Sequence, residues 1–128
     1  MSTPSQKRFG FRKAEHLRRP SDFRRVYERR RSASDAWILV YACENGLTHS
    51  RLGLSVSRKM GPATHRNRLR RLYREAFRLT RQELPAGLDL IVIPRSMQEP
   101  TLETLKGSLP RLVKKISQRL VQDSGERS

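Results

Sequence analysis

Residues 58–78 read RKMGPATHRNRLRRLYREAFR and combine a dense positive charge with regular apolar spacing. Glu75 is the one acid in this stretch. At about 100° per residue, Leu69, Tyr73 and Phe77 fall on one side of a helix. The opposite side is basic and polar, with Arg70, Arg74, Arg78 and Arg81 and, beside them, Asn67 and Arg71. The stretch therefore predicts a helix that packs on a sheet by its apolar side and presents a row of arginines.

The charge of the whole chain indicates a polyanionic partner. Its 128 residues carry 28 Lys and Arg against 12 Asp and Glu, a formal net charge of +16. Residues 1–35 hold eleven basic and four acidic side chains, and residues 51–81 hold ten and one, so these two blocks supply the excess. A solvated helix usually interleaves acids four residues from its bases, but Glu75, four residues after Arg71, is the only acid among these arginines and leaves most of the row unpaired. Phosphate contact is therefore favoured over simple solvation of the helix. Of the 28 basic residues, 22 are arginines, and genome composition is the competing explanation of this bias.

Two strands are expected before the basic helix. Residues 51–57, RLGLSVS, alternate strictly, with the leucine and valine side chains facing inward. Residues 36–43, AWILVYAC, are rich in β-branched and aromatic side chains. Asn45-Gly46 between them is a hairpin signal. We therefore expect the two strands to pair with each other in an antiparallel hairpin.

Three more segments complete the pattern: a short helix over residues 20–30, a strand over residues 86–94 and a helix over residues 100–123. Ser21 is the expected N-cap of the first helix and Thr101 that of the last. Gly107 and Pro110 should kink the last helix or divide it in two. The fold class is therefore α+β, with one small, mostly antiparallel sheet packed against helices.

A single domain is expected, with uneven ends. Residues 16–122 should form one domain, residues 1–15 a basic extension and residues 123–128 a frayed tail. Cys43 is the only cysteine, so no intramolecular disulfide can form and a reducing, cytoplasmic location is expected. No stretch approaches about 18 consecutive apolar residues, so we expect no membrane span. No obligate protein partner is evident.

The sequence offers no catalytic group. His16, His49 and His65 lack metal-ligand spacing, and no carboxylate pair stands where acid–base or two-metal chemistry would need it. Binding of a nucleic acid is therefore favoured over catalysis by the chain alone. A structural RNA-binding protein of the ribosome or of its assembly is one interpretation, and a DNA-binding module is a weaker one.

The basic helix and the loop before it carry a pattern of residue types at fixed intervals. A hydrophobic residue is followed at set intervals by alanine, by Arg-Asn-basic, and by further hydrophobic and basic positions. The residues that occupy these places are Met60, Ala63, Arg66, Asn67, Arg68, Leu69, Arg70, Arg71 and Arg74. This pattern resembles the Arg-Asn-Arg segment of the bacterial ribonuclease P protein component, and similarity extends over about residues 16–120. The resemblance implies an α-β-β-β-α-β-α sandwich with a left-handed β-α-β crossover, and its additional strand is expected near residues 57–59.

The resemblance also implies a function. In that family an RNA subunit carries the chemistry with Mg²⁺ held mainly by RNA and substrate, while the protein binds this RNA and the 5′ leader of precursor tRNA. By position, contact with the RNA subunit is implied for Arg66, Asn67, Arg68, Arg70, Arg71 and Arg74. A leader-binding cleft is implied for Phe23, Tyr27 and Tyr41, with Ser55, Ser57, Arg58 and Lys59 on its far side. Trp37 could belong to the core or to the cleft edge, and Pro62 departs from the small or aliphatic residue usual at its position.

Overall fold

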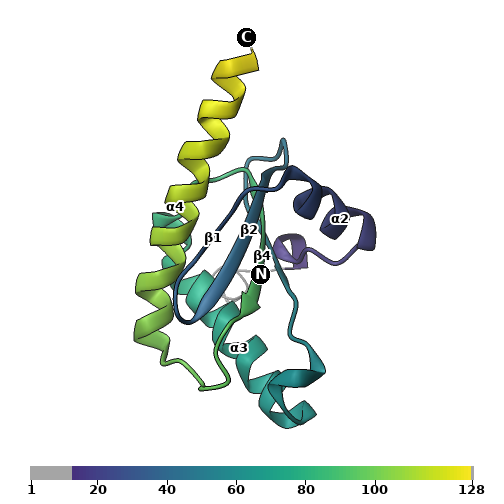
Figure 1. Ribbon diagram of the computed structural model, residues 1–128, viewed down its shortest axis with the longest axis vertical. Helices are drawn as coiled ribbons and strands as arrows, with labels where there is room; N and C mark the ends of the chain where they lie inside the picture. The colour runs from purple at the N-terminus through teal and green to yellow at the C-terminus, as the bar shows by residue number, and fades with distance from the viewer. Residues whose placement is uncertain (1–12, 128) are drawn as a thin grey trace, which may run out of the picture.

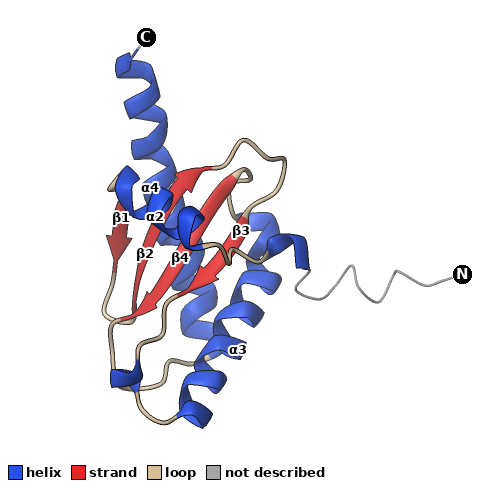
Figure 2. Ribbon diagram, turned by 90° about the vertical axis from the view of Figure 1, so that its right-hand side faces the viewer, coloured by secondary structure: helices blue, strands red, loops and turns tan. Residues whose placement is uncertain are grey.

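The computed structural model describes residues 13–127, which form a four-stranded sheet with α2 on one face and α3 and α4 on the other (Figures 1 and 2). The elements are η1 Lys13–Glu15, α2 Pro20–Arg29, β1 Ser32–Ser34, β2 Ile38–Glu44, β3 Arg51–Leu54, η2 Arg58–Met60, α3 Ala63–Thr80, η3 Arg81–Glu83, β4 Leu88–Pro94 and α4 Leu102–Arg127. The α+β class is confirmed.

The strand order is β1-β2-β4-β3, so the expected hairpin between the second and third strands is wrong. β4 lies between them, antiparallel to β2 and parallel to β3. Leu90, Ile91 and Val92 are all buried, because both faces of β4 are covered by other elements. An unbroken apolar strand belongs at the centre of a sheet. The turn at Asn45-Gly46 therefore carries the chain past the end of β4 instead of folding it back on β2.

The crossover and the fourth strand complete the topology. β3, α3 and β4 form a left-handed β-α-β unit, as the resemblance implies (Figure 2). The additional strand is β1, which pairs with β2 through Ser32 opposite Tyr41. Residues 58–60, which overlap the position expected for this strand, form the 3-10 turn η2 instead. Its Met60 is buried in the main core, which holds the turn against the sheet.

The helix ends differ from the sequence expectations. α2 begins at Pro20, and no side chain caps it, so Ser21 is not the N-cap. Thr101 does cap α4, because its Oγ1 accepts a hydrogen bond of 3.1 Å from the Thr104 N–H. α4 continues through Pro110 as one helix up to Arg127, instead of dividing in two.

The end of α4 is held by ion pairs. Asp123 accepts hydrogen bonds of 2.9 Å from Arg29 and 2.8 Å from Arg31. These bonds, led by those from Arg31, lower the pKa of the Asp123 carboxyl below its usual value. The helix therefore stays anchored at a position expected to lie in the frayed tail. Residues 1–12, most of the expected basic extension, lie outside the described residues.

The core has two parts on opposite faces of the sheet. The larger one joins the sheet to α3 and α4 and contains Leu69 and Phe77, as the helical spacing predicts. The smaller one lies under α2, where Val26 is fully buried. Trp37 packs against the larger part and so lies away from α2. In the described part of the chain, no helix is long and apolar enough to cross a membrane.

A buried carboxylate fixes α2 on the sheet. Asp89 of β4 is fully buried and receives bonds from Arg51 at 2.8 and 2.6 Å, from Asn45 at 2.9 Å and from Arg25 of α2. Burial alone would raise the pKa of Asp89, but the hydrogen bonds outweigh it and the pKa is lowered. Asp89 therefore remains ionised and ties three segments together.

Replacing Asp89 with asparagine should lower the free energy of unfolding by about 3 kcal/mol, because Arg25 and Arg51 lose their shared charge partner. This loss of stability is near the lower limit for breaking a buried ion pair, because the Arg25 side chain is 40% exposed. The folded-state pKa lies below the unfolded value, near 3.9. The stabilisation is thus complete above that pH and disappears as the pH falls through the folded-state pKa.

Denaturant unfolding at pH 7 and near pH 3 measures this difference. Asp22→Asn is the matched control, because Asp22 also faces Arg25 and Arg51 but only at 3.5 and 3.8 Å. A deficit for Asp89→Asn no larger than that of the control at pH 7 would contradict the anchoring role.

Candidate nucleic-acid-binding surfaces

Three aromatic side chains from α2 and β2 form one row, which we call the aromatic surface: Phe23, Tyr27 and Tyr41. The rings of Phe23 and Tyr27 lie 6.5 Å apart, centroid to centroid, because they are one helical turn apart. Tyr27 meets Tyr41 edge to face at 5.0 Å. All three side chains are only partly buried. The sequence thus brings together rings that a nucleobase can contact from solvent.

The sheet extends the aromatic surface beyond α2. Tyr41 stands opposite Ile91 of β4, which stands opposite Gly53 of β3. Side chains two residues along a strand share a face, so Ser55 lies on the same face as Gly53. Its N–H donates to the Val92 carbonyl at 3.1 Å, which continues the pairing of β3 past its last residue. Ser55 therefore adds a hydroxyl to this face of the sheet.

Ser57, Arg58 and Lys59 follow at the end of this face. All three are exposed, and Arg58 and Lys59 lie in η2, between β3 and α3. Partly buried Leu39 and Ile93 face each other in the neighbouring strands. Neither was among the predicted cleft residues, although the alternation along each strand places them on the same side as Tyr41. Leu39 and Ile93 therefore form an apolar floor, which is flanked by the serine hydroxyl groups and by the positive charges of Arg58 and Lys59.

Gly53 carries a packing role that the sequence did not reveal. A β-carbon at this position would lie 2.7 Å from Cζ of Phe23 and 3.2 Å from Cβ of Leu17. The alternation along residues 51–57 places Gly53 on the side opposite the inward leucines, where outward exposure was expected, but it is buried beneath the Phe23 ring. Only the absence of a side chain lets α2 place Phe23 directly on β3.

Replacing Gly53 with alanine should therefore displace the Phe23 ring. We expect a several-fold loss of affinity for leader-bearing precursor tRNA by the assembled enzyme, with affinity for the RNA subunit unchanged. Ala42→Gly is a matched control, because Ala42 faces the larger core on the opposite side of the sheet. Unaltered Phe23 ring signals in an NMR spectrum of Gly53→Ala would contradict the packing argument.

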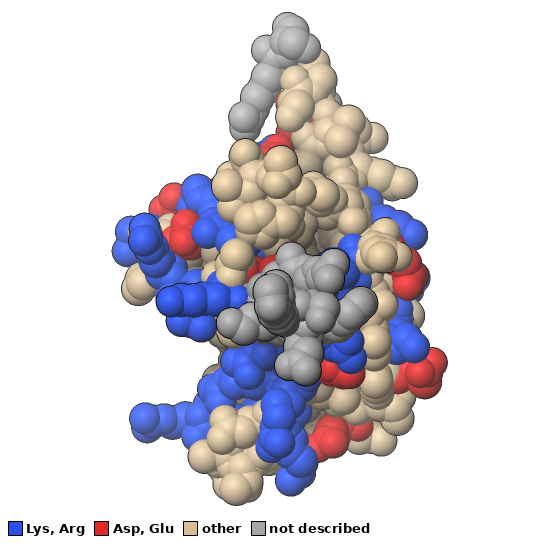
Figure 3. Space-filling view, turned by 180° about the vertical axis from the view of Figure 1, so that it is seen from behind, with Lys and Arg blue, Asp and Glu red and all other residues tan. Residues whose placement is uncertain are grey.

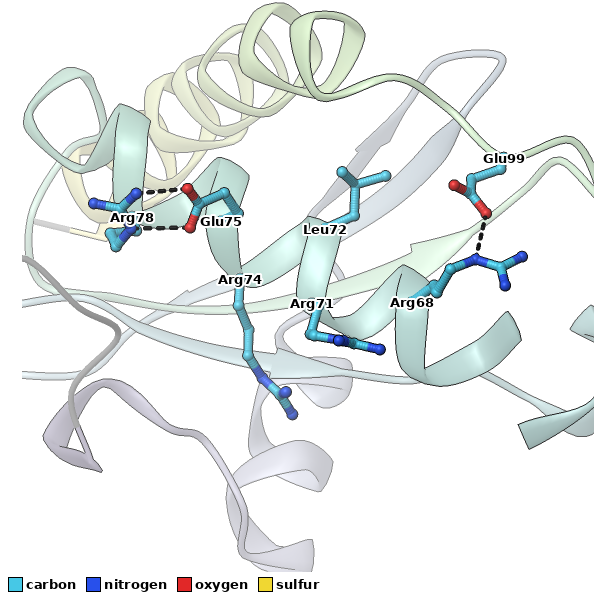
Figure 4. Close-up of a pocket in the computed structure, with 7 residues that line it drawn as sticks. All are labelled: Arg68, Arg71, Leu72, Arg74, Glu75, Arg78 and Glu99. Atoms are coloured by element: carbon cyan, nitrogen blue, oxygen red, sulfur yellow. Dashed lines mark hydrogen bonds and ion pairs between the residues drawn. The ribbon is translucent and has the colours of Figure 1, made fainter. Parts of the chain in front are cut away.

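The basic side chains of α3 divide into two groups. Arg68 donates to Glu99 at 3.3 Å and Arg78 pairs with Glu75 at 2.5 Å, whereas Arg71 and Arg74 point away from both acids (Figure 4). The hydrogen bond from Arg78 is the main reason why the pKa of Glu75 is lowered. The predicted row of unpaired arginines is thus shorter than expected, because Arg78 and Arg81 pair with acids, Arg81 with Glu15.

The start of α3 is organised by its own polar groups. Asn67 accepts a hydrogen bond of 2.9 Å from Arg70, and Arg66 donates to the Gly61 carbonyl at 3.2 Å. Pro62 directly precedes the helix with an extended backbone, so it starts α3 without distorting it. These bonds orient the side chains of Arg66, Asn67 and Arg70.

Figure 3 shows how the charge is distributed on one face of the molecule. Lys and Arg gather on its lower and left parts, over the regions that Figure 1 identifies as α3 and α2. In residues 13–127, no group of three or more His, Cys, Asp or Glu side chains is placed to hold a metal ion. The two surfaces therefore offer rings, hydroxyls and guanidinium groups for binding.

An α+β domain with a partly exposed aromatic row beside an arginine-rich helix belongs to the class of proteins that bind RNA. The sequence profile of the family Ribonuclease P matches residues 11–117. The ribonuclease P protein component of Clostridioides difficile is 38% identical over 107 residues, covering 82% of this chain and 94% of that protein.

Two solved structures show the same fold. The RNase P protein from Thermotoga maritima superposes with a TM-score of 0.71 at 36% identity, covering 79% of this chain and 96% of that one. The RNase P protein of Staphylococcus aureus gives 0.69 at 34% identity, with 82% and 96% covered. The chain belongs to the ribonuclease P protein family, and it functions as the protein subunit of a metal-dependent ribonucleoprotein endoribonuclease that processes the 5′ leaders of tRNA. A structural role in the ribosome is not favoured.

Proposed function

We propose that the chain uses two separate surfaces for two RNAs: α3 for the RNA subunit and the aromatic surface for the 5′ leader of precursor tRNA. The observation that carries this proposal is the difference in chemistry between them. The aromatic surface offers rings above an apolar floor, which suits unstacked bases. The α3 surface offers arginines without an aromatic side chain among them, which suits phosphates of a folded RNA.

On α3 the contact set comprises Arg66, Asn67, Arg68, Arg70, Arg71 and Arg74. Arg71 is exposed and has no acid partner in the described part of the chain, so its guanidinium can meet phosphate directly. Arg68 first has to exchange Glu99, at 3.3 Å, for a phosphate. Since both are exposed and their ion pair is weak, a bidentate phosphate contact displaces it readily.

On the other face, a base of the leader stacks on Phe23, Tyr27 or Tyr41. The hydroxyl groups of Ser55 and Ser57 lie along the same path and can hydrogen-bond to sugar or base. Arg58 and Lys59 at the end of this path attract the leader backbone. The leader needs no particular sequence for such binding, because every base has a face to stack.

The chemical step belongs to the RNA subunit. We place the divalent ion, Mg²⁺, on the RNA subunit and the substrate, because the described residues offer no ligand cluster for it. Bound there, the ion would supply an activated water and stabilise charge on the leaving oxygen. The chain itself orients the leader and neutralises phosphates. We propose cytoplasmic action, in keeping with a single buried cysteine that can form no intramolecular disulfide.

Reconstitution tests this function. The full chain is mixed with a bacterial ribonuclease P RNA and a precursor tRNA at low Mg²⁺ and moderate salt, and leader release is followed on a gel. We expect faster release than with the RNA alone, because the chain offsets phosphate repulsion that Mg²⁺ would otherwise screen. A rate equal to that of the RNA alone would refute the proposal.

A further inference from the structure

The segment before α2 is fixed beside β3 and α3. The Leu17 N–H donates to the Leu52 carbonyl at 2.9 Å, so this segment runs along the free edge of β3. Glu15 is buried and pairs with Arg81 at 2.8 Å, at the end of α3. Leu17 is also buried. The two residues that follow these anchors, His16 and Arg18, are therefore held against α3.

This arrangement creates a small basic recess that we call the notch, with a volume of about 340 Å³. Its polar walls are His16 and Arg18 from the segment before α2 and Arg70 and Arg74 from α3; its apolar walls are Leu17, Leu52 and Leu54. Leu17 separates the notch from Phe23, because both side chains meet at Gly53. The notch therefore lies between the aromatic surface and the Arg-Asn-Arg segment.

The charges in the notch are not balanced. Among the residues that the structure describes, none that lines the notch is acidic. Burial, then the charges of Arg70 and Arg18, lower the pKa of the Arg74 guanidinium. The pKa values of Arg51 and Arg78, outside the notch, are raised instead, because each of these arginines donates hydrogen bonds to a carboxylate. A partly buried arginine repelled by its neighbours indicates that an anion belongs beside it.

We propose that the notch binds one phosphodiester group of RNA, between Arg18 and Arg74, at the junction of the two RNA-binding surfaces. The proposal rests on the function proposed above and specifies where the two surfaces join. Guanidinium groups from two separate segments give a phosphate a fixed position. This phosphodiester can come from the leader strand or from the RNA subunit. The two sources have the same chemistry and are separated by experiment.

His16 reports on occupancy of the notch. Burial, then the positive charges of Arg18 and Arg74, lower the pKa of its imidazole. Charged groups face it from all sides: Glu15, Lys13, Arg18, Arg19, Asp22, Arg51, Arg70 and Arg74. An anion between Arg18 and Arg74 offsets the positive field, so binding should raise the pKa of His16.

The first experiment titrates His16 in the full chain by NMR, at constant ionic strength, with sulfate replacing chloride. Sulfate serves as the probe because it does not titrate near neutral pH. We expect sulfate to raise the pKa of His16 by about one unit. Arg18→Gln should reduce this shift, while Arg24→Gln, which removes another exposed charge, one on α2, should preserve it. No shift in the wild-type chain, or an equal shift in Arg18→Gln, would overturn the proposal.

The second experiment identifies the source in the assembled enzyme, again with Arg18→Gln against Arg24→Gln. A phosphodiester of the RNA subunit predicts an approximately tenfold loss of affinity for that RNA. A phosphodiester of the leader predicts a similar fall in the preference for leader-bearing over mature tRNA. Losses no greater than those of Arg24→Gln in both measurements would contradict the notch. If the wild-type chain does not accelerate leader release at all, the proposed function fails, whether or not sulfate shifts the pKa of His16.

Discussion

Replacing both Phe23 and Tyr27 with alanine should weaken the binding of leader-bearing precursor tRNA to the assembled enzyme by at least about tenfold. Stacking of one base on an aromatic side chain contributes roughly 1–3 kcal/mol, and a loss of about 1.4 kcal/mol is tenfold in affinity. Mature tRNA has no leader, so its affinity should stay the same. The measurement is the ratio of the two dissociation constants for wild type and variant.

A matched variant separates stacking from hydroxyl chemistry. Tyr27→Phe keeps the ring at 5.0 Å from Tyr41 and removes only the hydroxyl. It should retain most of the preference for leader-bearing tRNA. Circular dichroism and thermal unfolding should first show that the double variant is folded, because Phe23 also packs on Gly53. Equal losses for precursor and mature tRNA would refute the role of the aromatic surface.

The second large effect is expected on the opposite surface. Replacing Arg68 and Arg71 with glutamine should weaken binding of the RNA subunit by about a hundredfold, since each hydrogen bond from a charged group contributes about 1.5–3 kcal/mol. The slope of log affinity against log salt should fall by about two, because two phosphate contacts are lost. Affinity measured by filter binding over a series of salt concentrations gives both quantities.

The control for this variant removes the same charge elsewhere. Lys114 and Lys115 are exposed on α4, which packs with α3 on the face of the sheet away from α2. Lys114→Gln with Lys115→Gln should leave the affinity and the salt slope nearly unchanged. If both double variants lose affinity to the same extent, attraction by the overall charge of +16 explains RNA binding, and the specific contacts of α3 do not.

Local patterns in the sequence predicted most of the elements but not the strand order. The 3.6-residue period placed Leu69 and Phe77 in the core, because helix packing depends on residues three and four apart. The Asn45-Gly46 turn signal is equally local, and it could not show that β4 lies between β2 and β3. The unbroken apolar run of β4 did carry that information, because a strand covered on both faces belongs inside a sheet.

The candidate surfaces were predictable where a spacing was fixed and unpredictable where distant residues meet. The basic positions of α3 followed from the Arg-Asn-Arg pattern. The charge partner of Arg68 did not, because Glu99 lies 31 positions away in the chain. The packing role of Gly53 was also not predictable, because Gly53 lies beneath Phe23 only once α2 has packed on β3. Three-dimensional contact, and not local composition, therefore decides which arginines are available to RNA.

Site-specific crosslinking tests most directly whether the two surfaces hold two different RNAs. A photoreactive phenylalanine derivative replaces Tyr27 in one variant and Arg71 in another, and each is assembled with the RNA subunit and with precursor tRNA carrying a labelled leader. We expect the crosslink from position 27 to fall in the leader and the crosslink from position 71 to fall in the RNA subunit. Crosslinks from both positions to the same RNA would contradict the division of the protein into two RNA-binding surfaces.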